Sequence, residues 1–186
     1  VASLDDPGVE AYLERIEHFD EAALSREAMG FARAMHDTGL VSDYHVTFLL
    51  YVLDYRDRAL VPDTLGLGAT GLDCWRHYRR LIEDLIRASV TLSTPQAVYG
   101  LTMLLERGVL HHGPMVPALD RQLRQKIEGS ARARISLGFG DLVSPETHLL
   151  ARVLQIIGQP LGVGQGANPT CQSARAIAMW SQVEPD

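Results

Sequence analysis

The sequence predicts an all-α protein, arranged as an antiparallel helical bundle or as stacked helical hairpins, with seven to eight helices. Small polar residues, often followed by proline, recur along the chain, and this combination is typical of the start of a helix. Between these positions, apolar residues return every third or fourth place, as expected for a helix with one buried face. Strictly alternating segments, the pattern of a strand, are almost absent.

Eight helix starts follow one another along the chain. At each of them a polar side chain or a proline suits the first turn, where backbone N–H groups have no partner within the helix. Glycines at positions 39, 108, 129 and 158 stand where we expect helices to end. The predicted starts are Asp6-Pro7, Asp20, Ser42-Asp43, Thr70, Thr94-Pro95, Val116-Pro117, Ser144-Pro145 and a position near Cys171.

Two parts of the chain are distinguished. Residues 1–158 are predicted to form the helical bundle, in which residues 133–140, "ARISLGFG", are expected to be an extended connection because their glycines weaken a strand. Residues 159–186 read as a glycine-rich loop and the start of a cysteine-headed helix, which could continue into a further domain.

Composition excludes several classes of function. With 46% hydrophobic and 22% charged residues the chain resembles an ordinary globular domain, and its net charge of −6 contains no basic block, so we expect no nucleic-acid partner. The apolar runs 46–53 and 97–105 are shorter than the roughly 20 residues of a bilayer span, which predicts no membrane partner. No metal-binding or dinucleotide motif is present, so neither a metal nor a cofactor is expected.

The two cysteines are too few for a disulfide framework, and the first residues lack the features of a secretion signal. We therefore predict a cytoplasmic location. Cys74 stands beside Leu72 and Trp75 and is expected to be a core residue. His45 and His148 are isolated, His111 and His112 are expected to cap carbonyls or face solvent, and residues 76–80, "RHYRR", read as a solvated helix face.

The stretch "QPLGVGQGANPTCQSARAIAMW", residues 159–180, is where chemistry is most visible. Cys171 is placed at a helix start, where the positive end of the helix dipole favours the thiolate over the thiol. The preceding glycines allow the backbone to approach a substrate closely. Cys171 is therefore a candidate nucleophile, and Gly164, Gly166 and Asn168 are candidate substrate-binding residues.

Gln165 stands six residues before Cys171, and this spacing resembles that of papain-like cysteine peptidases; transglutaminase-like enzymes share the cysteine-headed helix. The resemblance implies that Cys171 is the nucleophile and that the Gln165 amide donates to the oxyanion, together with the Cys171 backbone N–H. It covers residues 159–180 only. Gln172 replaces the aromatic residue that usually follows the cysteine, and no histidine follows it, so the general base is expected from beyond Asp186 or from a partner.

The sequence thus favours the helical N-terminal portion of a cysteine-dependent acyl-transfer enzyme, a peptidase, amidase or deamidase. The alternative is a helical scaffold or protein-interaction domain without chemistry, in which residues 162–169 are only a loop between helices. We expect a protein or peptide partner.

Overall fold

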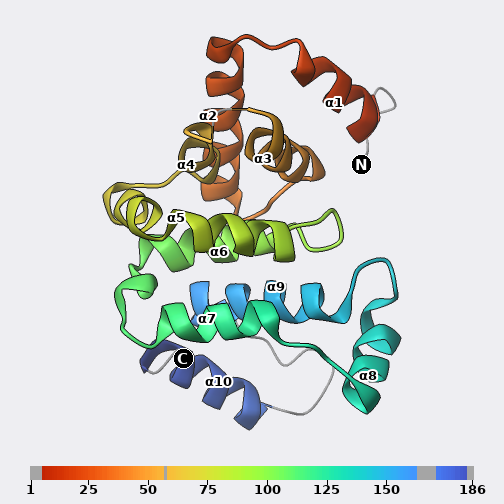
Figure 1. Ribbon diagram of the computed structural model, residues 1–186, viewed down its shortest axis with the longest axis vertical. Coiled ribbons are helices and arrows are strands. Elements are labelled where there is room, and N and C mark those ends of the chain that lie inside the picture. Colours follow the sequence, from red (N-terminus) through yellow and green to blue (C-terminus); the bar gives the residue numbers. More distant parts are fainter. Residues whose placement is uncertain (1–5, 57, 163–170, 184–186) are drawn as a thin grey trace.

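The structure is a computed structural model that describes residues 6–56, 58–162 and 171–183. Within these ranges the chain forms ten α-helices, two short 3₁₀-helices and no strand (Figure 1). The all-α prediction is confirmed, and the predicted number of helices is too low. The elements are α1 (Gly8–Glu17), α2 (Glu21–Thr38), α3 (Asp43–Tyr55), α4 (Leu60–Leu65), α5 (Ala69–Ser89), α6 (Gln96–Glu106), η1 (Val109–His111), α7 (Met115–Arg124), α8 (Gly129–Phe139), α9 (Pro145–Gly158), η2 (Pro160–Gly162) and α10 (Cys171–Val183).

The predicted helix starts are observed within two residues. At three of them the expected side chain accepts a hydrogen bond from a backbone N–H of the first turn: Asp20 at α2, Ser42 at α3 and Ser144 at α9. These bonds join residues three apart, so the sequence alone contains both partners. Gly39, which follows α2, has a φ of 69°, as its predicted role at a helix end requires.

Two helices, α4 and α8, were not predicted. The extended connection expected at residues 133–140 is wrong, because most of this segment belongs to α8, and Gly129 begins that helix rather than ending one. No residue of α8 is buried, so the helix has no periodic apolar face that a pattern could reveal. A contact with α9 helps to place it: Arg132 Nη2 lies 2.7 Å from Glu146 Oε1.

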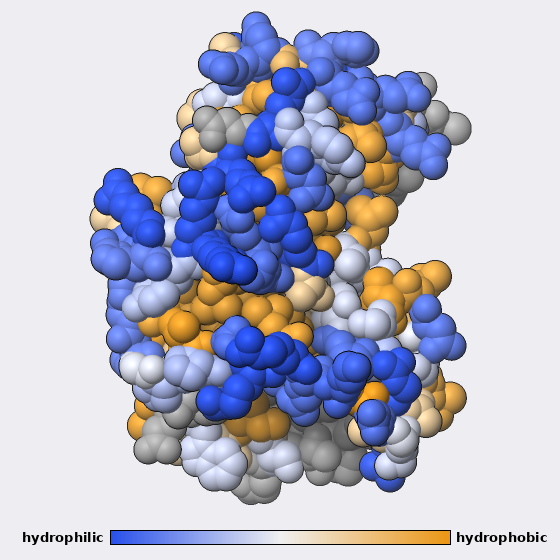
Figure 2. Space-filling view, viewed as in Figure 1, coloured by the Kyte–Doolittle hydropathy of each residue, from blue (hydrophilic) through white to orange (hydrophobic). Residues whose placement is uncertain are grey.

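The helices lie in successive layers (Figure 1). Helices α1 to α4 form one end, α5 and α6 the middle, and α7 to α10 the other end. One cluster of buried apolar side chains runs from Tyr12 to Ile157 and joins these layers. Hydrophilic side chains cover much of the visible face over α5 and α7, and apolar side chains show between them (Figure 2). None of the described helices is long and apolar enough to cross a bilayer.

Helices α6 and α9 approach each other closely at two glycines. A Cβ atom added to Gly100 would lie 2.7 Å from the backbone N and Cα of Gln155, and one added to Gly158 would lie 2.0 Å from the Gly100 carbonyl oxygen. Helix α9 ends at Gly158, as predicted, and the absence of a side chain at this glycine also allows the close packing on α6. Cys74 is fully buried, as predicted, and burial raises the pKa of its thiol.

Candidate functional site

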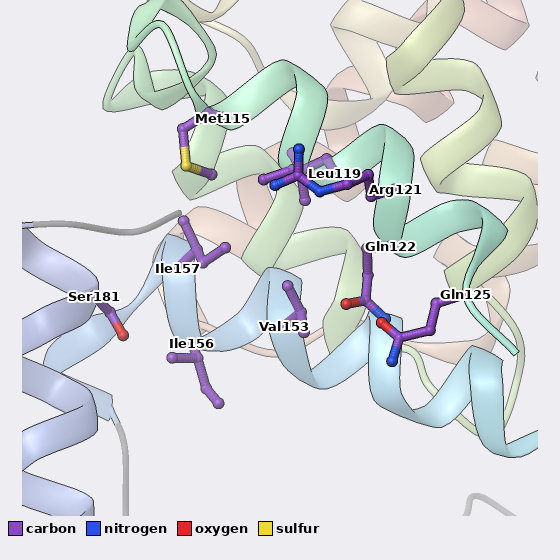
Figure 3. A pocket seen from close by; sticks show the side chains of 10 residues that line it. Met115, Leu119, Arg121, Gln122, Gln125, Val153, Ile156, Ile157 and Ser181 are labelled. Atoms are coloured by element: carbon purple, nitrogen blue, oxygen red, sulfur yellow. The ribbon is translucent and has the colours of Figure 1, made fainter. Parts of the chain in front are cut away.

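A groove of about 360 Å³ lies between α7 and α9 and reaches α10 (Figure 3). Helix α9 packs mainly on α6, while α7 packs on α5 and η1. The facing sides of α7 and α9 are therefore left without a helix between them. The lining residues are Met115, Ala118, Leu119, Arg121, Gln122 and Gln125 from α7 and the segment after it, Val153, Ile156 and Ile157 from α9, and Ser181 from α10.

Each wall of the groove is one face of a helix. On α7 the lining positions 115, 118, 119 and 122 have the spacing i, i+3, i+4 and i+7, which places them on one side. On α9 the lining positions 153, 156 and 157 have the spacing i, i+3 and i+4, so they also lie on one side of their helix. Val153 and Ile156 are only half-buried, whereas Met115 and Leu119 are buried at the base of the wall. The groove therefore presents apolar surface that another apolar segment could cover.

The rim formed by α7 is polar and positively charged. Arg121 is exposed and forms no ion pair with any described residue, whereas its neighbour Arg124 pairs with Asp120 on the same helix. Gln122 and Gln125 add two amides beside it (Figure 3). None of the described residues that line the groove is acidic, and Arg121 is the one charged residue among them.

Helix α10 closes one end of the groove. Its Ser181 is buried, and the Ser181 hydroxyl donates to the Ile177 carbonyl at 2.6 Å, so this side chain is already partnered. Nearby positions on α10 carry exposed apolar side chains, among them Met179, Trp180 and Val183. The apolar surface of this end of the molecule thus extends beyond the groove itself.

Cys171, the predicted nucleophile, lies at the other end of α10. The helix begins at Cys171, as predicted, and Ser181 is ten residues further on, which is about 15 Å along the axis. Gln165, Gly164, Gly166 and Asn168 lie outside the described residues. The groove and the start of α10 are therefore separate places on the molecule.

Away from the groove, a cluster of charged side chains surrounds Glu83 on α5. This carboxylate is only 6% exposed, and its two oxygens accept hydrogen bonds from Arg58 at 2.9 Å and Arg79 at 2.8 Å. Arg87 lies 3.9 Å away and also pairs with Asp54. The solvated face expected at residues 76–80 is confirmed, because its charged side chains are exposed, and only the carboxylate partner of Arg79 is buried.

His111 faces solvent, as expected, and it also contacts a carboxylate. Its Nε2 lies 3.1 Å from a carboxylate oxygen of Asp73, and the other oxygen of Asp73 lies 3.4 Å from Nδ1 of His77. This cluster adjoins Tyr78, whose backbone departs from helical geometry and kinks α5. Across the described part of the chain, no group of three or more histidine, cysteine, aspartate or glutamate side chains is arranged to hold a metal ion.

The groove was not predicted from the sequence, although the helical spacing of the apolar residues that line it is visible there. The spacings at 115, 118, 119 and 122 and at 153, 156 and 157 are those of buried helix faces, and a pattern cannot tell whether such a face meets the core or an open groove. Comparisons with protein-family models, with curated proteins and with solved structures found no match.

Proposed function

We propose that this chain is a helical protein-interaction domain that binds an amphipathic helix of a partner in the groove between α7 and α9. The observation that carries the proposal is the pair of facing apolar walls, each with helical spacing, with no described element between them. In helix-in-groove recognition, a partner helix inserts its i, i+3, i+4 and i+7 side chains into such a groove. A third helix packed across α7 and α9 would bury Val153 and Ile156.

Charge indicates the character of the partner helix. Arg121 on the rim has no ion pair among the described residues, and no acidic residue lines the groove. An apolar stripe flanked by aspartate or glutamate would place a carboxylate near this guanidinium. Because Arg121 is exposed, its main contributions are to orientation and to the rate of association, both of which weaken with added salt.

The test is selection from a displayed library of amphipathic helices, followed by fluorescence anisotropy with the best binder. Val153→Asp and Ile156→Asp place a charge in the groove at half-buried positions, and each is expected to weaken binding about tenfold or more. Leu137→Asp, on α8 and 90% exposed, is the matched control and should bind like the wild type. Binding that survives both groove substitutions would show that the groove is not the site.

A second candidate function is cysteine-dependent acyl transfer, and the specific observation in its favour is that α10 begins at Cys171. We propose Cys171 as the nucleophile, with Gln165 as the oxyanion donor and Gly164, Gly166 and Asn168 against the substrate. A helix N-terminus stabilises a thiolate by roughly 0.3 to 1 kcal/mol, less than one pKa unit. Full activation therefore needs a histidine from another segment or another protein.

The pH dependence of iodoacetamide labelling, followed by mass spectrometry, tests this second candidate. Cys171 is expected to label at lower pH than N-acetylcysteine, because the dipole stabilises its thiolate. Gln165→Ala should leave this labelling unchanged while removing any acyl transfer seen with an activated ester. Cys74 serves as the internal negative control because it is fully buried. A Cys171 that titrates at or above the free-thiol value of about 8.5 would refute the nucleophile.

A further inference from the structure

A small pocket of about 120 Å³ lies where the start of α6 meets α9 and the end of α8. Residues 93–96, which lead into the start of α6, line one side, and His148 and Arg152 of α9 line another. Phe139, from the end of α8, completes the wall. The pocket volume is several times the roughly 30 Å³ that a water molecule occupies in the liquid. It lies apart from the groove, with which it shares no lining residue.

His148 is the unusual member of this pocket. Its side chain is only 8% exposed, and its Nε2 is the one buried side-chain nitrogen or oxygen, within the described ranges, that has no hydrogen-bond partner. Buried polar atoms are rarely left unsatisfied, because the free-energy cost of removing them from water is then not recovered. The imidazole stacks on Phe139, with ring centroids 5.1 Å apart and planes at 26°, and this contact holds the ring in place.

The start of α6 adds the positive end of a helix dipole. Helix α6 begins after Pro95 without a side-chain cap. The nearest hydroxyl that could cap it, that of Thr94, instead donates to the Ser89 carbonyl at 2.7 Å. The Ala97 and Val98 N–H groups donate to the carbonyls of Thr94 and Pro95, so this end of the 11-residue helix contributes only the partial positive charge of its dipole, which no side-chain cap neutralises.

Arg152 supplies the full charge. Its guanidinium lies over the Phe139 ring, 5.5 Å from the centroid, and donates to the Gln155 side-chain oxygen at 2.9 Å. No ion pair joins Arg152 to a carboxylate anywhere in the described ranges, and none of the described pocket-lining residues is acidic. The Gln155 side chain also carries an NH₂ group, which is a donor.

We infer that this pocket binds a small oxyanion, a phosphate or a carboxylate. One aromatic ring contacts both the imidazole and the guanidinium, and residues 93–96 at the start of α6 line the same pocket. These groups are donors or positive charges, and an oxyanion has both the negative charge and the several acceptor oxygens that they require. The His148 Nε2 gains its missing partner when it donates to such an oxygen.

The experiment is an NMR titration of the histidine ring signals with inorganic phosphate and, separately, with acetate, at constant ionic strength maintained with sodium chloride. We expect a saturable shift of the His148 signals, which His148→Gln identifies by their loss. Saturation by phosphate alone, by acetate alone or by both decides between the two sources of the oxyanion. Ser93→Ala, at an exposed position, should weaken the same titration without loss of folding.

Arg152→Gln, also at an exposed position, should raise the dissociation constant about tenfold, as loss of a charge-assisted hydrogen bond does. Arg134→Gln on α8 makes the same change of charge outside the pocket and should leave the dissociation constant unchanged. The inference is overturned if neither anion shifts the His148 signals saturably, which is the result expected if a water alone satisfies Nε2. It is also overturned if Arg152→Gln and Arg134→Gln have equal effects.

Discussion

Replacing Gly100 by alanine tests whether α6 and α9 hold the layers of the molecule together. In an ordinary helix this change is stabilising, because alanine has a helix propensity about 1 kcal/mol better than glycine. At Gly100, however, the new Cβ would lie 2.7 Å from the backbone of Gln155. Gly30, in the middle of α2, has nothing within 4 Å of the corresponding position and provides a matched control.

The expected loss of stability follows from the distance by which α6 and α9 must separate to accommodate the new Cβ atom. Ordinary van der Waals contact begins at 3.4 Å, so α9 must move away from α6 by about 0.7 Å at this point. The obstacle is backbone and cannot rotate away as a side chain would. Overpacking of this kind costs about 1 to 3 kcal/mol, and occasionally more, in a well-packed interior. After the gain of about 1 kcal/mol in helix propensity, we expect Gly100→Ala to lower the free energy of unfolding by up to about 2 kcal/mol.

Urea unfolding followed by far-ultraviolet circular dichroism measures both variants. Gly30→Ala is expected to raise the free energy of unfolding by about 0.5 to 1 kcal/mol. The two substitutions are chemically identical, so their difference reports the environment of the added methyl group and not its intrinsic propensity. A Gly100→Ala protein as stable as Gly30→Ala would show that α6 and α9 do not approach each other as described.

Three further substitutions test buried polar groups. Burial lowers the pKa of His45 to about 4, below its unfolded value of about 6.5, so the unfolded state binds the proton first. The free energy of unfolding therefore falls by about 3 kcal/mol as the pH decreases between these two values. Urea unfolding at about pH 7.5 and 4.5 should show a loss of stability that His45→Gln lacks, and an equal loss in both proteins would contradict the assignment. Glu83→Gln should lower the free energy of unfolding by roughly 2 to 4 kcal/mol, because two arginines lose a buried counter-ion; a thermal midpoint that does not change would rule this out. Tyr12→Phe removes the 2.8 Å hydrogen bond to Glu27 and should cost about 1 kcal/mol in the same assay, whereas no change would mean that water replaces the bond fully.

The interactions that start helices are local, and this is why the sequence predicts them well. Asp20, Ser42 and Ser144 each bond to a backbone N–H three residues further on, so the whole interaction lies within a short window. Helix α8 was not predicted because it buries no residue and so has no periodic apolar face. Its contact with α9 joins Arg132 to Glu146, which lie too far apart in the sequence for a short window to include both.

The candidate sites depend on contacts that a linear pattern does not contain. The spacing at 153, 156 and 157 predicts an apolar face, but only the packing of α9 on α6 leaves part of that face toward a groove. His148 looks isolated in the sequence, and its partner Phe139 lies in a segment expected to be extended.

By itself, the amino-acid sequence determined the all-α class, most of the helix starts, the buried character of Cys74 and the start of α10 at Cys171. These properties follow from hydrogen bonds between near neighbours and from the periodicity of apolar residues. Only the tertiary structure decided that Gly100 and Gly158 bring two helices into backbone contact and that residues 93–96 lie beside residues 148–152. Both depend on how distant helices pack, since the surface that each helix buries is set by its partners and not by its own pattern.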